Sequence, residues 1–219
     1  QDLLQYNQQQ YWLSINKKYG LRWDFLRRFM LYKFSDGASI EHSLHSDMSL
    51  YLKVHRTIST ALDNSLAALN DPNKPVIVIA HSLGCEQISN YLWDANHSLR
   101  HFALDARLST QQQDFRRLTT CKGLITTGCN IPIFRAGIAK PKLFKRPSAD
   151  FIWHNYFDVH DVLAYPLRDM YPHDDTHWIK DNKVRVSGWL KRWNPLSHGQ
   201  YWVSDSVLLP IAKEILKSL

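Results

Sequence analysis

The sequence predicts an α/β fold in which helices flank a mostly parallel sheet. Two observations favour it: the β-branched run Pro75-Val-Ile-Val-Ile-Ala80, and further short apolar runs that alternate with helical segments. A continuous apolar run of this kind is typical of a strand buried on both faces of a parallel sheet. Strands that alternate with helices are typical of α/β architecture. The 219 residues fit a single domain, residues 1–219.

The N-terminal part, residues 1–46, is predicted to be helical. Aromatic and aliphatic side chains follow helical spacing over residues 11–19, and Gly20 suits a helix end. A second helix is expected over residues 23–34, with a break at Asp36-Gly37. A third is expected from about residue 47 to residue 70.

The later elements follow the first strand in a regular order. They are a helix at 86–93, strands at 123–128 and 150–155, a short alternating strand at 183–187, and a closing helix at 207–219. Two remaining stretches, residues 134–147 and 168–189, are candidate cover loops over a site at the sheet edge.

Charge and hydropathy exclude several classes of partner. The 27 basic and 20 acidic residues give a net charge of +7, which favours anionic partners. The densest basic stretch, residues 140–146, is short and contains a proline, and zinc-finger spacing and a basic recognition helix are lacking. We therefore interpret it as a solvated loop and expect no nucleic-acid partner. No apolar run reaches the roughly 18 residues of a membrane span, so none is expected.

Cysteine and histidine spacing argues against a metal site. Cys85, Cys121 and Cys129 are an odd number without metal-type pairing, which favours reduced, partly buried thiols and a cytoplasmic location. His173-Asp-Asp-Thr-His177 has metal-like spacing, but the preceding proline and the missing helical periodicity favour a surface loop. Neither a metal nor a cofactor is expected.

The strongest motif is Ala80-His81-Ser82-Leu83-Gly84, which lies between a predicted strand and a predicted helix. Small-x-Ser-x-Gly in that context is the nucleophile-elbow pattern. The turn is tight, so the residues two positions either side of the serine must be small, and its backbone is strained. The Leu83 N–H points to where an oxyanion would form. For His81, substrate contact and packing against the sheet edge remain alternatives.

An elbow serine requires an acid and then a histidine later in the chain. Asp158 and Asp161 follow the third predicted strand, where an orienting carboxylate belongs. His198 lies in a loop directly before the final helix, from which it can reach Ser82.

Three segments together resemble the α/β-hydrolase superfamily: residues 80–84, Asp-Val-Leu-Ala-Tyr-Pro-Leu at 161–167, and Ser-His-Gly-Gln-Tyr-Trp at 197–202. They look most similar to bacterial lipase- and esterase-like serine hydrolases. The resemblance implies Ser82 as nucleophile, His198 as general base and Asp161 as orienting acid, with Asp158 as the alternative acid. It also implies a small-molecule substrate whose carboxylic ester or related acyl bond is cleaved through an acyl-enzyme.

Two departures from the family pattern affect the expected fold and function. The first elbow position is Ala80 instead of glycine, and no His-Gly precedes Ser82 to supply the second oxyanion N–H. We therefore expect a sheet without its N-terminal strand or strands, in which Val76 to Ile79 lie at an open edge or pair with residues outside this chain. The second oxyanion donor stays unassigned. The same departure supports an alternative, a catalytically silent hydrolase-fold binding or scaffold protein, whereas intact Ser82, Asp161 and His198 favour an enzyme.

Overall fold

The computed structural model describes residues 14–29, 50–98, 108–135, 138, 141–172, 174–186 and 195–218. Several sequence-based predictions lie outside these ranges. They include residues 11–13 at the start of the first predicted helix, the end of the second with its break at Asp36-Gly37, His173 in the metal-like segment, and Ser187 at the end of the predicted fourth strand.

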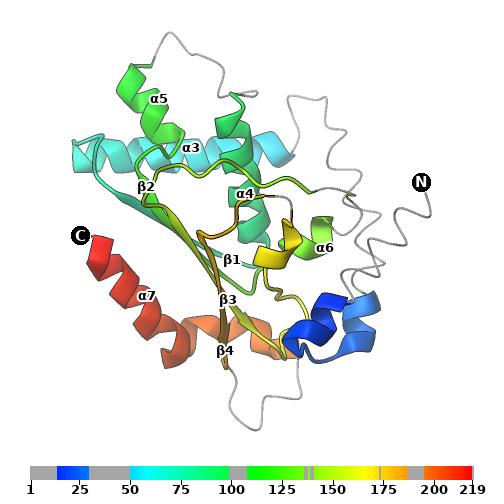
Figure 1. Ribbon diagram of the computed structural model, residues 1–219. Coiled ribbons are helices and arrows are strands. Elements are labelled where there is room, and N and C mark those ends of the chain that lie inside the picture. The colour runs from blue at the N-terminus through cyan, green and yellow to red at the C-terminus, as the bar shows by residue number, and fades with distance from the viewer. Residues whose placement is uncertain are drawn as a thin grey trace.

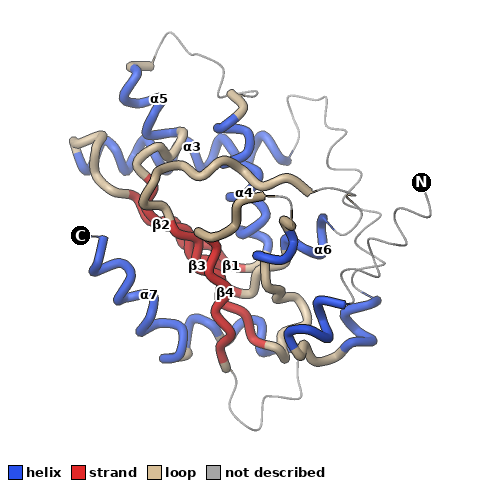
Figure 2. The backbone as a smooth tube through the Cα atoms, in the orientation of Figure 1, coloured by secondary structure: helices blue, strands red, loops and turns tan. Residues whose placement is uncertain are grey.

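Among the described residues, four parallel strands form the centre of the fold: β1 (Val76–His81), β2 (Cys121–Thr127), β3 (Ile152–Asp158) and β4 (Ile179–Val184). Their order in the sheet is the same as their order in the chain, and each neighbouring pair is parallel. Figure 2 shows the strands as one twisted layer between helices. The predicted α/β class with a parallel sheet is therefore confirmed.

Helices cover both faces of this sheet (Figure 1). One face carries α3 (Leu50–Leu69), α4 (Leu83–Asn96) and α5 (Thr110–Arg116), and the other carries α7 (Asp205–Ser218). Shorter elements are α6 (Ile131–Arg135) and the 3₁₀ segments η2 (Arg168–Met170), η4 (Pro195–Gly199) and η5 (Tyr201–Val203). Residues 14–19 and 24–29 are also helical. None of the described helices combines the length and apolar character needed to cross a membrane.

Strand β1 is at the edge of the described sheet, where it pairs only with β2. This placement agrees with the expectation of an open edge at Val76 to Ile79. The further expectation, that the strand is buried on both faces, is wrong: Ile79 is 40% exposed and no residue of β1 is fully buried. An edge strand has a neighbour on one side only, so it is packed less completely than a central strand.

Strand β4 lies at Ile179–Val184, four residues before the predicted start at Lys183. The alternating Lys-Val-Arg-Val pattern is misleading, because the strand begins at the buried Ile179, directly after the buried Trp178. The expectation of a cover loop over residues 168–189 is therefore wrong for the part that forms β4. In the other candidate cover, residues 134–147, Leu143 and Phe144 are buried in the core.

Helices α5 and α6 were not predicted. Helix α5 nevertheless carries a local signal, because Ser109 and Gln112 form a reciprocal capping box at its start. Helix α6 has only five residues and begins Ile131-Pro132, so its sequence shows no helical period.

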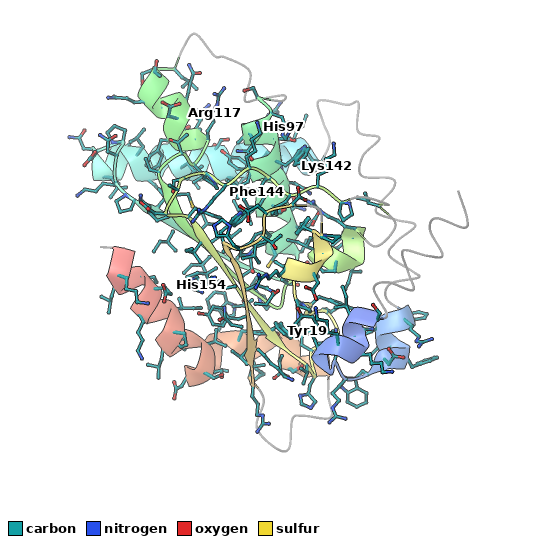
Figure 3. All side chains as sticks on the ribbon, viewed as in Figure 1. Tyr19, His97, Arg117, Lys142, Phe144 and His154 are labelled. Atoms are coloured by element: carbon teal, nitrogen blue, oxygen red, sulfur yellow. The ribbon has the colours of Figure 1, made fainter. Side chains whose placement is uncertain are left out.

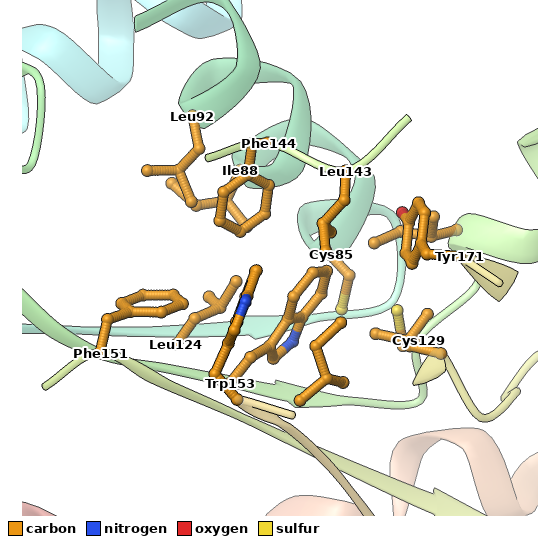
Figure 4. Close-up of a cluster of buried hydrophobic side chains, with 14 of the residues drawn as sticks. Cys85, Ile88, Leu92, Leu124, Cys129, Leu143, Phe144, Phe151, Trp153 and Tyr171 are labelled. Atoms are coloured by element: carbon orange, nitrogen blue, oxygen red, sulfur yellow. The ribbon is translucent and has the colours of Figure 1, made fainter. Parts of the chain in front are cut away.

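The core on the α4 face is built around Trp153, which is fully buried (Figure 4). Its ring stacks on Phe144 with centroids 5.4 Å apart, and its indole N–H donates to Thr126 Oγ1 at 2.9 Å. A second cluster fills the opposite face beneath α7 and includes Val207 and Ile211. His154 points from β3 toward α7, where its Nε2 lies 3.7 Å from Glu214 Oε2 (Figure 3).

We predict that Trp153→Ala lowers the free energy of unfolding by about 3–5 kcal/mol, because it leaves a large cavity and removes a buried hydrogen bond. Urea denaturation followed by circular dichroism measures the loss. The matched control is Trp202→Ala, since Trp202 is 43% exposed; it should cost about 1 kcal/mol or less. Equal losses in the two variants would contradict this description of the core.

Candidate functional site

Ser82 lies at a strained turn between β1 and α4. Its φ of 53° and ψ of −126° place a non-glycine residue in a sparsely populated backbone region. Two hydrogen bonds hold the turn: Ser82 N–H donates to Thr127 O at 3.1 Å, and Cys85 N–H donates to Ser82 O at 2.9 Å. The strain is therefore maintained by the sheet on one side and by the helix on the other.

The small residues of the motif face each other across this turn. A Cβ placed on Gly84 would lie 3.9 Å from Ala80 Cβ, an ordinary contact distance. A methyl group at position 84 would therefore fit against Ala80. Leu83 is the first residue of α4, and the N–H groups of a first helical turn have no acceptor within the helix. The Leu83 N–H is thus available at the position where the sequence expects an oxyanion donor.

The structure brings together the three side chains selected from the sequence. His198 Nε2 lies 2.7 Å from Ser82 Oγ, and His198 Nδ1 lies 2.8 Å from Asp161 Oδ2. A carboxylate only accepts hydrogen bonds, so Nδ1 carries the imidazole proton and Nε2 of the neutral ring accepts the Ser82 hydroxyl. Serine, histidine and aspartate therefore form a continuous hydrogen-bonded chain over separations of 116 and 37 residues.

Asp161 is fully buried and accepts two further hydrogen bonds. Leu163 N–H donates to Oδ1 at 3.0 Å, and the Tyr201 hydroxyl donates to Oδ2 at 3.0 Å. Burial raises the pKa of Tyr201 well above its usual value, so the phenol keeps its proton and remains a donor. Both carboxylate oxygens are thus fixed in the orientation that faces His198.

The alternative acid, Asp158, has different partners. Its Oδ1 accepts from the backbone and ring N–H groups of His160 at 2.9 and 3.0 Å, and its Oδ2 accepts from Val186 N–H at 2.8 Å. These bonds tie the end of β3 to the residues after β4. The structure therefore gives Asp161 the contact with His198, and Asp158 a structural position beside it.

His81 packs against the imidazole of His198, with ring centroids 4.8 Å apart. Its Nδ1 lies 3.1 Å from the Thr127 carbonyl oxygen and 3.0 Å from the Thr127 hydroxyl oxygen. Burial, followed by the charge of His198, lowers the pKa of His81. The observed contacts of His81 are packing contacts at the sheet edge, and a contact with substrate stays a prediction.

Gly128 adopts a φ of +57° directly after β2 and leaves room for both histidines. A Cβ at this position would lie 2.9 Å from His198 Cε1 and 3.1 Å from His81 Cε1. Both the backbone conformation and the close approach therefore require glycine here.

Apolar side chains are exposed around the serine. Leu83 is 48% exposed, and Trp202 is 43% exposed with its ring edge-on to His81 at 6.1 Å. Exposed large apolar groups beside a polar reacting centre suit contact with an apolar part of a ligand.

The three cysteines are free, as expected, and they are fully buried instead of partly buried. Burial raises the pKa of Cys121 to about 12, and it raises that of Cys129 well above its usual value. A protonated, buried thiol is a poor nucleophile. Ser82 is therefore the better candidate for nucleophilic chemistry at this edge of the sheet.

The described residues contain no group of three or more histidine, cysteine, aspartate or glutamate side chains that could hold a metal ion. In the segment with metal-like spacing, His177 Nδ1 contacts Asp175 Oδ1 at 2.5 Å, and both side chains are exposed.

No family model, curated protein or solved structure matches this chain.

Two residues at this site, Tyr201 and Gly128, received no role from the sequence. Tyr201 follows His198 by three residues within a short 3₁₀ region, and that proximity is the only local signal of its contact with Asp161. Gly128 stands at the end of a strand, where glycine is common for many reasons. Their roles depend on segments far apart in the chain.

We predict that Gly128→Ala displaces the His198 ring and breaks its hydrogen bond to Asp161, because the new Cβ overlaps the imidazole. Proton NMR measures this as loss of the far-downfield imidazole N–H resonance. The control is Gly199→Ala, since a Cβ at Gly199 meets nothing within 4 Å. The resonance should persist in the control, and its survival in Gly128→Ala would refute the steric argument.

Proposed function

We propose that this protein is a serine hydrolase of the α/β-hydrolase type, which cleaves a carboxylic ester or related acyl bond. The observation that carries the proposal is the hydrogen-bonded chain from Ser82 Oγ through His198 to the buried Asp161. It starts from a strained strand-to-helix turn, as a nucleophile elbow requires.

The geometry supports a two-step mechanism. Ser82 Oγ attacks the substrate carbonyl carbon while its proton moves to His198 Nε2, and Asp161 stabilises the imidazolium that forms. The proton on Nε2 then passes to the leaving alcohol, and the acyl group remains on Ser82 as an ester. Water, deprotonated by His198, attacks that ester and releases the carboxylic acid, after which the proton returns to Ser82. The Leu83 N–H contributes to stabilising the oxyanion in both steps.

The surroundings of Ser82 favour an apolar acyl or alcohol group on a small molecule. Leu83 and Trp202 present exposed apolar surface next to the reacting centre. Burial lowers the pKa of His81, which disfavours a positive charge beside the base. These features suit a neutral ester better than a highly charged substrate.

We expect a fluorophosphonate probe to label the protein covalently at Ser82, because the activated hydroxyl attacks phosphorus as it would a carbonyl carbon. Intact-mass spectrometry and peptide mapping measure the adduct and its position. Ser82→Ala should abolish labelling while leaving the fold unchanged. A folded wild-type protein that is not labelled would instead support the alternative, a catalytically silent binding or scaffold protein.

Asp161→Asn should reduce the rate of labelling and of ester hydrolysis by about 10⁴-fold, because the amide favours the wrong imidazole tautomer. Asp158→Asn is the matched control, since Asp158 is also buried but bonds other groups. In Asp158→Asn, the side-chain NH₂ group faces a backbone N–H donor and cannot accept its hydrogen bond. The free energy of unfolding should therefore fall by about 1–3 kcal/mol while labelling persists. Hydrolysis of a p-nitrophenyl ester and thermal unfolding separate the two effects. The reverse pattern would exchange the roles of the two aspartates.

A further inference from the structure

Arg27 is a fully buried arginine that lies far from Ser82 in the sequence and contacts the loop that carries Asp161. It belongs to the helical residues 24–29 in the N-terminal part of the chain. Its guanidinium has five N–H donors, and each has a backbone carbonyl as acceptor. The acceptors are the carbonyl oxygens of Arg22 at 2.7 Å, Ala164 at 2.9 Å, Val159 at 3.3 Å, Val162 at 3.4 Å, and Asp161.

Four of these five carbonyls belong to one short loop, residues 159–164, directly after β3. They lie on both sides of Asp161 and include its own carbonyl. The main chain of Asp161 is therefore held by Arg27, while its side chain is held by His198, Leu163 and Tyr201. Carbonyl dipoles that point at one another repel, and a cation at their centre converts this repulsion into attraction.

The segment around Arg27 is itself fixed to the same region. Arg22 N–H donates to Val159 O at 2.7 Å, and the Tyr19 ring packs edge-on against Phe157 at 6.1 Å. The Tyr19 hydroxyl also donates to Asp169 at 2.9 Å. Figure 3 shows Tyr19 on the N-terminal helices, beside the end of the sheet. Arg27 thus belongs to a segment that itself contacts β3 and the residues after β3.

No other side chain can replace this contact in full. The guanidinium is planar and delocalised, with five donors in a fixed geometry, whereas lysine offers one compact ammonium with three donors. The guanidinium also lies 4.8 Å from the centroid of the Tyr165 ring, which adds a cation–π contact within the same loop region. Among the described residues, no carboxylate forms an ion pair with Arg27. Its buried charge is compensated by the loop carbonyls.

We propose that Arg27 is a positioning residue for the acid of the triad: it fixes the backbone of residues 159–164 so that the Asp161 carboxylate meets His198 Nδ1. The effect on activity rests on the proposed hydrolase function. The effect on the hydrogen bond between Asp161 and His198 does not, because that bond exists in the resting protein.

The test compares Arg27→Lys with Arg28→Lys in the full chain. Arg28 is the adjacent residue on the same helix, but it is half exposed and pairs with Asp24 at 2.8 Å. In Arg27→Lys we expect the downfield His198 N–H resonance to shift or disappear. We also expect kcat for a p-nitrophenyl ester, and the rate of fluorophosphonate labelling, to fall about 10- to 100-fold with KM within twofold of wild type. Arg28→Lys should retain the resonance and both rates.

Each outcome has a defined meaning. One outcome combines two results: folded Arg27→Lys loses the resonance, and the probe never labels the wild-type protein. This outcome would support the positioning role and refute the hydrolase proposal. An unchanged resonance and unchanged rates would overturn the positioning role. Arg27→Gln provides a second variant, with a planar amide and no charge. If neither Arg27 variant folds, as judged by circular dichroism, Arg27 is a general stability residue and the proposal is refuted.

Discussion

The carboxylate of Asp161 is fully buried, and a buried charge costs several kcal/mol unless hydrogen-bond donors surround it. The protein supplies those donors from the Leu163 backbone, the Tyr201 hydroxyl and the His198 ring. Together these three donors compensate for the water that the buried carboxylate has lost. The position of His198, and through it the hydrogen bond to Ser82, therefore follows from satisfying one buried charge.

The parallel sheet explains why these distant residues can meet. In a parallel sheet the carboxyl ends of all strands lie along one edge, and connecting loops at that edge are neighbours in space. Ser82 follows β1, Gly128 follows β2 and Asp161 follows β3, while His198 arrives from the segment before α7. The Ser82 N–H to Thr127 O bond ties the first two of these loops together. The site is thus formed jointly by the loops that follow three neighbouring strands and by the segment before α7.

The loop that carries Asp161 is fixed at both of its ends. Arg27 binds the carbonyls of residues 159–164, and Asn155 Nδ2 donates to Tyr165 O at 2.9 Å. Asp181 on β4 accepts from Asn155 and from the backbone N–H groups of residues 167 and 168. Burial raises the pKa of Asp181. Polar groups are thus buried in this region to hold the backbone, because a loop without sheet or helix pairing needs other hydrogen-bond partners.

The choice of His198 and Asp161 rested on their places along the chain and on a family resemblance, with Asp158 as the alternative acid. The sequence by itself determined the α/β class, three of the four described strands and the tight turn at Ser82. These features have local signals, because a β-branched run or a small-x-Ser-x-Gly turn depends on neighbouring residues. The tertiary structure decided the rest: the register of β4, the edge exposure of β1, and the roles of Tyr201, Gly128 and Arg27. In the sequence Arg27 is only a charged residue at the margin of an apolar helical stripe. Its function depends on carbonyls more than 130 residues away, and only the folded chain brings them together.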